Sequence, residues 1–134
     1  MRYLLDANIL SALVHREPAR VSEHVRSVGQ ANVCTSIIVA AELRFGVAKI
    51  RSVRLMQRVE ELLATIDVLP FEEPADTVYG EIRVQLEKRG RPIGANDLFI
   101  AAHAISLGYT LVSANEREFS HVPGLRTENW LRRT

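Results

Sequence analysis

The sequence predicts an α/β protein, a three-layer sandwich with a central parallel sheet of four to five strands and helices on both faces. Short apolar runs of strand length alternate along the chain with longer stretches in which apolar residues recur at helical spacing. This alternation favours a parallel sheet, because each helix carries the chain back to the edge where the next strand begins. The helical stretches outnumber the crossovers, so we also expect a helical hairpin around residues 36–64.

Length and composition indicate one domain over residues 1–134, large enough to bury a core without disulfides or zinc. The single cysteine, Cys34, lies in an apolar run and is expected to be a small core residue. There is no signal peptide and no apolar run of membrane length, so we expect a cytoplasmic protein without membrane contact. The net charge of +1 does not by itself indicate a nucleic-acid binder.

The first half of the chain is expected to contain two strands and four helices. Glu17-Pro18 separates the first two helices, because proline is tolerated only in the first turn of a helix, and Gly29 ends the second. Either Thr35 or Ser36 can cap the third helix. The expected elements are a strand at residues 3–5, helices at 7–15 and 18–28, a strand at 32–35, and helices at 36–50 and 53–64.

The second half supplies the remaining strands. Pro70 closes a strand, Pro74 opens a helix that stops at Gly90, and Gly108 ends the apolar helix that follows. The expected elements are a strand at residues 66–69, a helix at 74–90, a turn at 91–94, a helix at 97–107, a strand at 109–112, a short loop or helical turn at 115–119, and a weak fifth strand at 122–127.

Four carboxylates lie where acids are costly. Asp6 follows the apolar run 3–5 directly, and Glu42 lies inside the almost wholly apolar stretch 37–43. Asp97 opens an apolar helix, and Glu118 comes just beyond the strand that ends near Val112. A carboxylate removed from water costs several kcal/mol unless it is paired or bound to a metal, so these four positions need an explanation.

Each acid alone has an ordinary explanation. Asp6 and Asp97 could be helix caps, Glu42 could pair with Arg44 or Arg83, and Glu118 could be plain surface. Together they are more informative, because parallel strands and the helices that follow them meet at one edge of the sheet, where ligands bind. Four carboxylates at that edge repel one another, and a hard divalent cation relieves the repulsion. Ligands that are all oxygens favour Mg²⁺ or Mn²⁺ over zinc.

Other kinds of site are poorly supported. The four histidines show no metal-ligand spacing, and His103, on a helix among alanines, is expected to be packed rather than catalytic. A serine hydrolase would need a nucleophile elbow, and a nucleotide-binding loop would need a Walker lysine; the sequence has neither.

The sequence resembles the PIN-domain ribonucleases, specifically the VapC-type toxins of type II toxin–antitoxin modules. The resemblance covers essentially the whole chain, and its strength lies in the order and spacing of motifs that are weak one by one. These motifs are Leu4-Leu5-Asp6-Ala7-Asn8, Ser36 through Glu42-Leu43 with Phe45-Gly46, Gly90-Arg91-Pro92-Ile93-Gly94, Asn96 through Ala104, and Leu111-Val112-Ser113-Ala114-Asn115 through Glu118-Phe119.

The resemblance implies a PIN-like nuclease domain and a role for each matching residue. Asp6 and Asp97 match the main metal ligands, Glu42 the third acid, and Glu118 the fourth and most variable acid. Supporting positions are Asn8, Ser113 and Asn115. Two residues depart from the family pattern. Ala7 replaces the usual Thr or Ser, and Asn115 replaces an Asp found in many members, which shifts weight to Glu118.

The activity implied by the resemblance is Mg²⁺-dependent endoribonuclease cleavage, with Mn²⁺ able to substitute. Glu42 or Glu118 would orient or deprotonate the attacking water, so the products would carry 5′-phosphate and 3′-hydroxyl ends. Candidate RNA contacts, chosen because they lie near the motifs, are Arg44, Lys49 and Arg91. Surface arginines without such a role are at least as common.

The same resemblance implies partners. A cognate VapB-type antitoxin would wrap the toxin, using an apolar groove that Leu55, Met56, Leu62 and Leu63 could supply. A homodimer is expected on family analogy, and RNA, with tRNA favoured, is the implied substrate. Its cleavage would inhibit translation.

Two alternatives stay open. One is a non-catalytic PIN-like protein that binds RNA or acts as a scaffold, which Mn²⁺ titration would distinguish. The other is an aspartate-based phosphatase of the haloacid-dehalogenase kind, since Asp6 and Asn8 follow a strand. That class needs a second carboxylate at the place of Asn8 and a lysine after a later strand, and both are missing here.

Overall fold

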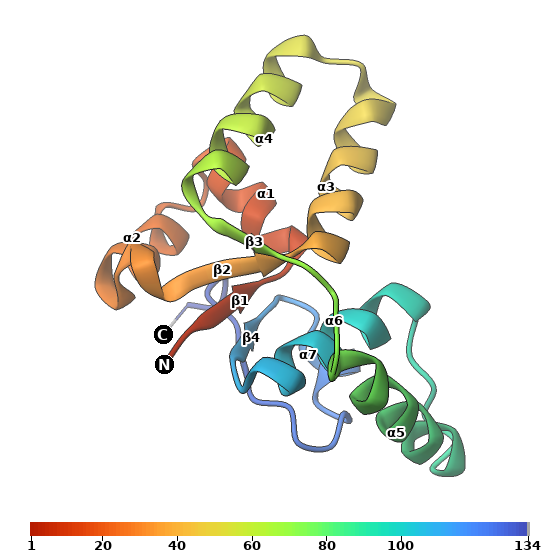
Figure 1. Ribbon diagram of the computed structural model, residues 1–134. Coiled ribbons are helices and arrows are strands. Elements are labelled where there is room, and N and C mark those ends of the chain that lie inside the picture. The colour runs from red at the N-terminus through yellow and green to blue at the C-terminus, as the bar shows by residue number, and fades with distance from the viewer. Residues whose placement is uncertain (134) are drawn as a thin grey trace.

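The computed structural model describes residues 1–133 and contains a five-stranded, entirely parallel sheet (Figure 1). The strands lie in the order β3-β2-β1-β4-β5, so the first strand occupies the centre. Their bounds are β1 Tyr3–Leu5, β2 Val33–Ser36, β3 Asp67–Leu69, β4 Thr110–Val112 and β5 Thr127–Glu128. The predicted parallel sheet is confirmed. The fifth strand is two residues long and begins at Thr127, so its predicted span of 122–127 was wrong at nearly every position.

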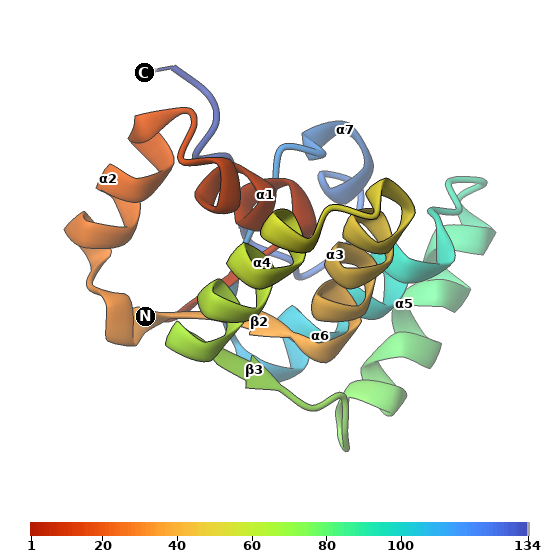
Figure 2. The same cartoon turned by 90° about the horizontal axis from the view of Figure 1, so that it is seen from above.

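Helices cover both faces of this sheet, as predicted. From β1 to β3 the strands are added toward one edge of the sheet, and β4 and β5 are then added toward the opposite edge. Right-handed crossovers therefore place α1 to α4 on one face and α5 and α6 on the other (Figures 1 and 2). The helices are α1 Ala7–His15, α2 Ala19–Val28, α3 Ile37–Ile50, α4 Val53–Thr65, α5 Ala75–Lys88, α6 Ala95–Leu107 and α7 Glu116–Phe119, with a 3₁₀ turn at Gln30–Asn32. Among residues 1–133, every helix is too short or too polar to cross a bilayer.

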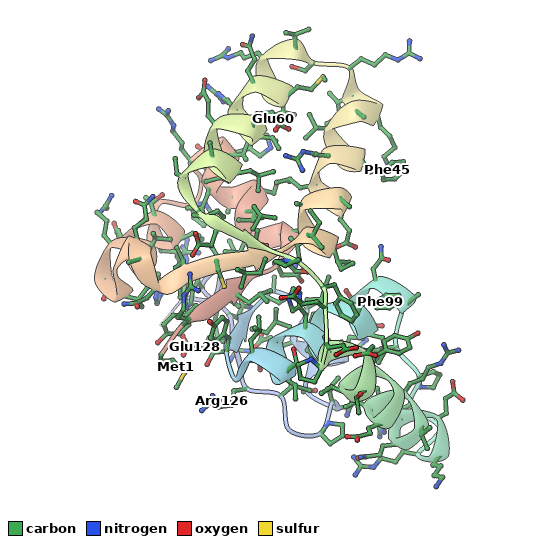
Figure 3. All side chains as sticks on the ribbon, in the orientation of Figure 1. Met1, Phe45, Glu60, Phe99, Arg126 and Glu128 are labelled. Atoms are coloured by element: carbon green, nitrogen blue, oxygen red, sulfur yellow. The ribbon has the colours of Figure 1, made fainter. Side chains whose placement is uncertain are left out.

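The predicted helical hairpin is formed by α3 and α4, which project together from the sheet (Figure 1). Arg51 ends α3 in the left-handed conformation, and the Ser52 hydroxyl caps α4 by accepting from the Leu55 amide. Between the two helices, Arg44 donates two hydrogen bonds of 2.9 Å to Glu60, which faces α3 (Figure 3). The outer side of α3 carries Phe45, which is 65% exposed.

Helix caps at strand ends fix how the chain turns at the future site. Asp6 caps α1 directly after β1, and Ser36 caps α3 directly after β2 by accepting from the Ile38 amide. Thr35, the other cap candidate, instead donates to the Leu5 carbonyl at 2.7 Å and ties β2 to β1. Each cap satisfies amide groups that would otherwise be unpaired where the helix begins.

Two sequence expectations about the core are confirmed. Cys34 is fully buried, and burial raises the pKa of its thiol to about 11, so it is an unreactive core residue. His103 of α6 is buried. Its Nδ1 lies 2.8 Å from the Ser36 hydroxyl, and the Phe71 ring packs edge-on against the imidazole. Burial lowers the pKa of His103, which keeps the ring neutral.

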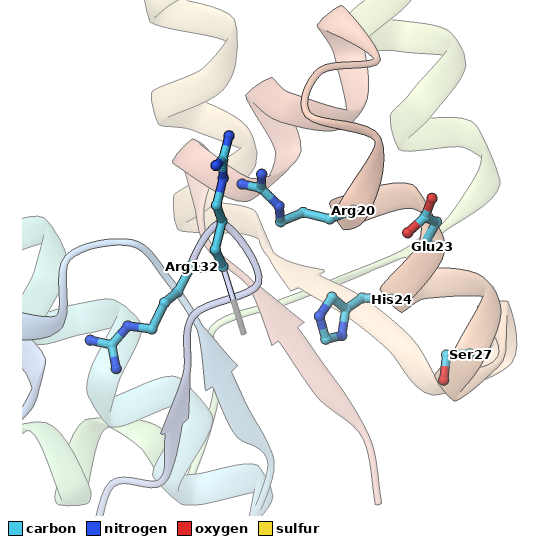
Figure 4. A pocket seen from close by; sticks show the side chains of 6 residues that line it. Arg20, Glu23, His24, Ser27 and Arg132 are labelled. Carbon is cyan, nitrogen blue, oxygen red and sulfur yellow. The ribbon is translucent and has the colours of Figure 1, made fainter.

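The segment after β5 is held against α2. Trp130, which is 1% exposed, stacks on the His24 ring at 5.1 Å between centroids, and Arg20 donates to the Leu131 carbonyl at 2.8 Å. The two parts enclose a pocket of about 420 Å³, with Arg20, Glu23, His24 and Ser27 along α2 and Arg132 on the other side (Figure 4). Because Arg132 is paired with Glu116 and Arg20 holds a carbonyl, these arginines anchor the segment.

Replacing Trp130 should therefore destabilise the whole domain. Trp130→Ala removes a fully buried ring from the contact between α2, β1 and the last segment, which costs about 3–5 kcal/mol. Trp130→Phe keeps an aromatic face for His24 and should lose much less. Urea unfolding followed by circular dichroism measures both. Equal midpoints for Trp130→Ala and the unmodified chain would contradict this packing.

Candidate functional site

Four acidic side chains from distant parts of the sequence lie along one edge of the sheet. Asp6 follows β1, Asp97 sits in the first turn of α6, Glu42 is in the middle of α3, and Glu118 is in α7 just after β4. Their electrostatic influence on one another is direct, because the negative charges of Asp6, Glu42 and Glu118 all raise the pKa of Asp97. The structure thus brings all four predicted acids together.

Asp6 is the most buried of these acids, with 5% exposure. Its Oδ1 accepts from the Ala7 amide at 2.8 Å, and its Oδ2 accepts from the Ser113 hydroxyl at 2.6 Å. Burial raises the pKa of Asp6, while these two donors act in the opposite direction. Asp6 is therefore a helix cap and a member of the acidic cluster at the same time, so the two explanations of this residue do not compete.

Asp97 and Glu118 share one amide. Asn115 Nδ2 donates to Asp97 Oδ2 at 3.1 Å and to Glu118 Oε2 at 2.8 Å, which holds the two carboxyls side by side. Burial first, and then Glu118, raises the pKa of Asp97 to about 8. The pKa of Glu118 is lowered, first by its interaction with the Asp97 carboxyl and then by the Gly94 amide, which donates to it at 3.0 Å. The two pKa values therefore move apart, upward for Asp97 and downward for Glu118.

Glu42 is paired with an amide rather than with a cation. Asn96 Nδ2 donates to Glu42 Oε2 at 3.2 Å, and burial raises the pKa of Glu42. The suggested arginine partners are engaged elsewhere, Arg44 with Glu60 and Arg83 with Glu87. From sequence alone, Asn96 is placed at the start of a family motif but is given no role in the site. Its signal was its place directly before Asp97, in a turn that must face the other acids.

The three predicted supporting residues form one hydrogen-bonded chain. Asn8 Nδ2 donates to the Ser113 hydroxyl at 3.4 Å, and Asn8 Oδ1 accepts from the Ala114 amide at 3.0 Å. The same hydroxyl accepts from the Asn115 amide at 3.0 Å and donates to Asp6. Ser113 thus connects Asp6 to Asn115, and Asn115 in turn donates to Asp97 and Glu118. The supporting residues therefore fix the positions of three of the four acids.

The three candidate RNA contacts lie in different surroundings. Arg44 is paired with Glu60 on the hairpin, and Lys49 lies over the Phe45 ring, 4.8 Å from its centroid. Arg91 lines the same pocket as Asn115 and Glu118, which places it beside the acids.

The acidic cluster fits a hard divalent cation in its chemistry. Its donors are carboxylate, amide and hydroxyl oxygens, and within residues 1–133 none of the four acids forms a salt bridge. In this part of the chain no three Asp, Glu, His or Cys side chains already have metal-ligand spacing. Amide groups of Asn96 and Asn115 occupy oxygens of Glu42, Asp97 and Glu118 that a cation would need.

Comparisons with known proteins find similar sequences and similar structures. Residues 3–125 match the model of the PIN domain. The chain is 38% identical over 131 residues to a tRNA(fMet)-specific endonuclease VapC of Shigella flexneri, covering 97% of this chain and 98% of the relative. It is 38% identical over 133 residues to Ribonuclease VapC2 of Haemophilus influenzae, covering 98% and 99%. Among solved structures, the VapBC2 complex of Rickettsia felis bound to a promoter DNA fragment superposes with a TM-score of 0.90, at 34% identity, over 97% of this chain and 99% of that one.

Proposed function

The chain belongs to the PIN-domain family, with VapC ribonucleases among its relatives, and on that basis we propose that it is an Mg²⁺-dependent endoribonuclease and the toxin of a type II toxin–antitoxin pair. The observation that supports this most strongly is the acidic cluster, in which Asp97 has a pKa raised to about 8 beside three other acids. Such a cluster destabilises the fold when no cation is present, and its oxygen ligands suit a divalent cation. The named relative supports tRNA as the substrate, and with it a cytoplasmic activity that inhibits translation.

Asp6 and Asp97 would hold the cation, with Glu42 close by. When bound, Mg²⁺ or Mn²⁺ supplies positive charge that stabilises the developing phosphate negative charge and makes a water more acidic.

The chain's own residues do the remaining work. Ser113 and Ala7 fix the orientation of Asp6, and Asn115 fixes that of Asp97 and Glu118. Glu42 or Glu118 orients the attacking water or takes its proton, as each lies beside Asp97 and is less buried than Asp6. The proton then passes to solvent, because neither Glu42 nor Glu118 is fully buried.

The nature of the cut ends tests this chemistry. Purified protein incubated with total tRNA and Mg²⁺ should release fragments with 5′-phosphate and 3′-hydroxyl ends, because water is the nucleophile. Fragments that end in a 2′,3′-cyclic phosphate would show that the RNA 2′-hydroxyl attacks, and the proposal would then be wrong. Treatment with polynucleotide kinase and ligase distinguishes the two ends.

A groove on this chain, beside the acids, is the proposed docking site of the antitoxin. A hollow of about 320 Å³ lies between α1, α3 and α4, lined by Asn8, Glu42, Leu43, Gly46, Val47 and Leu55 among others. The residues predicted from sequence were only partly right. Leu55 lines the groove, whereas Leu63 is 6% exposed and belongs to the core, and Leu62 lines a different hollow with Leu13 and Arg58. The similar solved VapBC structures of Rickettsia felis and Salmonella typhimurium are toxin–antitoxin complexes, which supports a VapB-type partner here.

Filling this groove should block the antitoxin and spare the nuclease. A Cβ atom added at Gly46 meets nothing within 4 Å, so the backbone there has room for a side chain, and Gly46→Trp should fill the hollow. We expect affinity for the cognate antitoxin to fall by about a hundredfold, since a helix that docks there loses its apolar seat. RNA cleavage should fall much less than antitoxin affinity, because the two proposed metal ligands, Asp6 and Asp97, do not line the hollow.

Gly80 of α5 offers a matched control, because it also has open space around it and lies outside the groove. Gly80→Trp should leave antitoxin affinity unchanged. If both variants bind the antitoxin as tightly as the unmodified chain in calorimetry, the groove is not its docking site.

We also propose a homodimer, for which the exposed Phe45, Ile50 and Val53 offer apolar surface.

A further inference from the structure

A pocket that contains two arginines adjoins the acidic cluster. It encloses about 340 Å³ and is lined by Arg91, Pro92, Ile93, Asn115, Arg117 and His121, together with Glu118. Asn115 connects the two regions, because it donates to Asp97 and to Glu118 and, like Glu118, also lines this pocket with the two arginines. Any ligand in this pocket lies directly beside the proposed reaction centre.

The arginines of this pocket are not used to stabilise the fold. Within residues 1–133, neither Arg91 nor Arg117 forms a salt bridge with a carboxylate. Both are exposed. Arg20 and Arg132 of the α2 pocket, by contrast, hold the chain's last segment. Arg91 Nη1 donates to His121 Nε2 at 3.0 Å, and this contact sets the two side chains next to each other across the pocket.

RNA needs positive charge close to the acidic cluster. A polyanion that approaches four carboxylates is repelled unless cationic groups close by hold its phosphates. Arginine suits this task because its planar fork donates two parallel hydrogen bonds to one phosphate. The rest of the wall offers apolar surface from Pro92 and Ile93 and the flat ring of His121, which is half-buried. Aromatic rings beside phosphate contacts are how proteins bind unpaired bases.

We propose that this pocket, defined by Arg91, Arg117 and His121, binds the nucleotide of single-stranded RNA that flanks the cut phosphate. Arg91 and Arg117 hold phosphates, and the base stacks on His121. The inference rests on the proposed nuclease function and adds to it the residues that position the substrate. It also implies that unpaired RNA is preferred, since a base inside a helix cannot reach the ring.

The test compares Arg91→Ala/Arg117→Ala with a charge-matched control. Arg26→Ala/Arg54→Ala removes two exposed arginines from α2 and α4, outside this pocket. For a stem–loop RNA with an unpaired loop, the pocket variant should raise KM about tenfold and leave kcat nearly unchanged, because the arginines hold substrate and do not touch the reacting atoms. The control should match the unmodified chain.

Salt dependence separates a phosphate contact from a structural role. In an Asp97→Asn background, which binds without cutting, the slope of log affinity against log salt should become shallower by roughly 1.4, as expected for two single-strand phosphates. His121→Ala should weaken binding of the loop about tenfold, and His121→Phe should restore it, since either ring stacks on a base.

Two results overturn the inference. One is a pocket variant whose KM and salt slope equal those of Arg26→Ala/Arg54→Ala, and the other is equal affinity for the loop RNA and a fully paired duplex. Failure of the nuclease proposal looks different, because then the unmodified chain itself cuts no RNA in Mg²⁺.

Discussion

Asp97→Asn is expected to abolish RNA cleavage while leaving the protein folded. The substitution keeps the size of the side chain and its place in the first turn of α6, but it removes the charge around which the other acids are arranged. Loss of one charged group at a phosphoryl-transfer site lowers the rate by on the order of a thousandfold or more. Fluorescence cleavage assays on tRNA measure this loss.

The same variant should be more stable than the unmodified chain when no divalent ion is present. The pKa of Asp97 is raised from 3.8 to about 8 in the fold, so the folded state holds a proton that the unfolded chain releases. Its contribution therefore lowers stability as pH rises through this range, and the full penalty is reached above pH 8. Because Asp97 is only half-buried, screening by solvent reduces the gain at neutral pH to on the order of 1–2 kcal/mol.

Asp76→Asn is the matched control, since Asp76 also lies in a first helical turn but is exposed on α5. It should change neither the cleavage rate nor the melting temperature by much. A normal cleavage rate in Asp97→Asn would show that the catalytic site lies elsewhere. A lower melting temperature without metal would show that Asp97 is a structural residue.

Removal of divalent ions is expected to have an effect of similar size. Protein treated with EDTA should cut no tRNA, and Mg²⁺ or Mn²⁺ should restore cleavage. The ion should also raise the melting temperature, because it binds the folded acids and not the unfolded chain. At a hundred times its dissociation constant it adds about 2.7 kcal/mol.

A matched comparison makes this second prediction specific. Asp6→Asn/Asp97→Asn should show neither the ion-dependent cleavage nor the ion-dependent rise in melting temperature. Cleavage that persists in excess EDTA would contradict the metal mechanism, and an equal rise in both proteins would place the ion at another site.

Much of this site was predictable because it depends on local rules. Asp6 directly follows an apolar strand, so parallel topology alone places its carboxylate at the ligand-binding edge. Asp97 opens an apolar helix, and the turn before it had to meet the same edge. The Ser36 cap and the hairpin of α3 and α4 also followed from sequence pattern.

What sequence could not supply are pairings between residues far apart. Nothing local indicates that Asn96 reaches Glu42, 54 positions away, or that Asn115 lies between Asp97 and Glu118. That Leu55, Leu62 and Leu63 do not line one hollow was unpredictable for the same reason, because helical spacing marks Leu62 and Leu63 as apolar without saying which neighbour covers each one. The fifth strand is so short that its two exposed residues carry no apolar pattern at all.

A crystal soaked in manganese and measured at the manganese absorption edge tests the acidic site most directly. An anomalous peak is expected between the carboxylates of Asp6 and Asp97, accompanied by release of Asp97 from the amide of Asn115. A map with no peak there, in crystals of protein that has been shown to cut RNA, would contradict the proposal that these acids bind the ion on which cleavage depends.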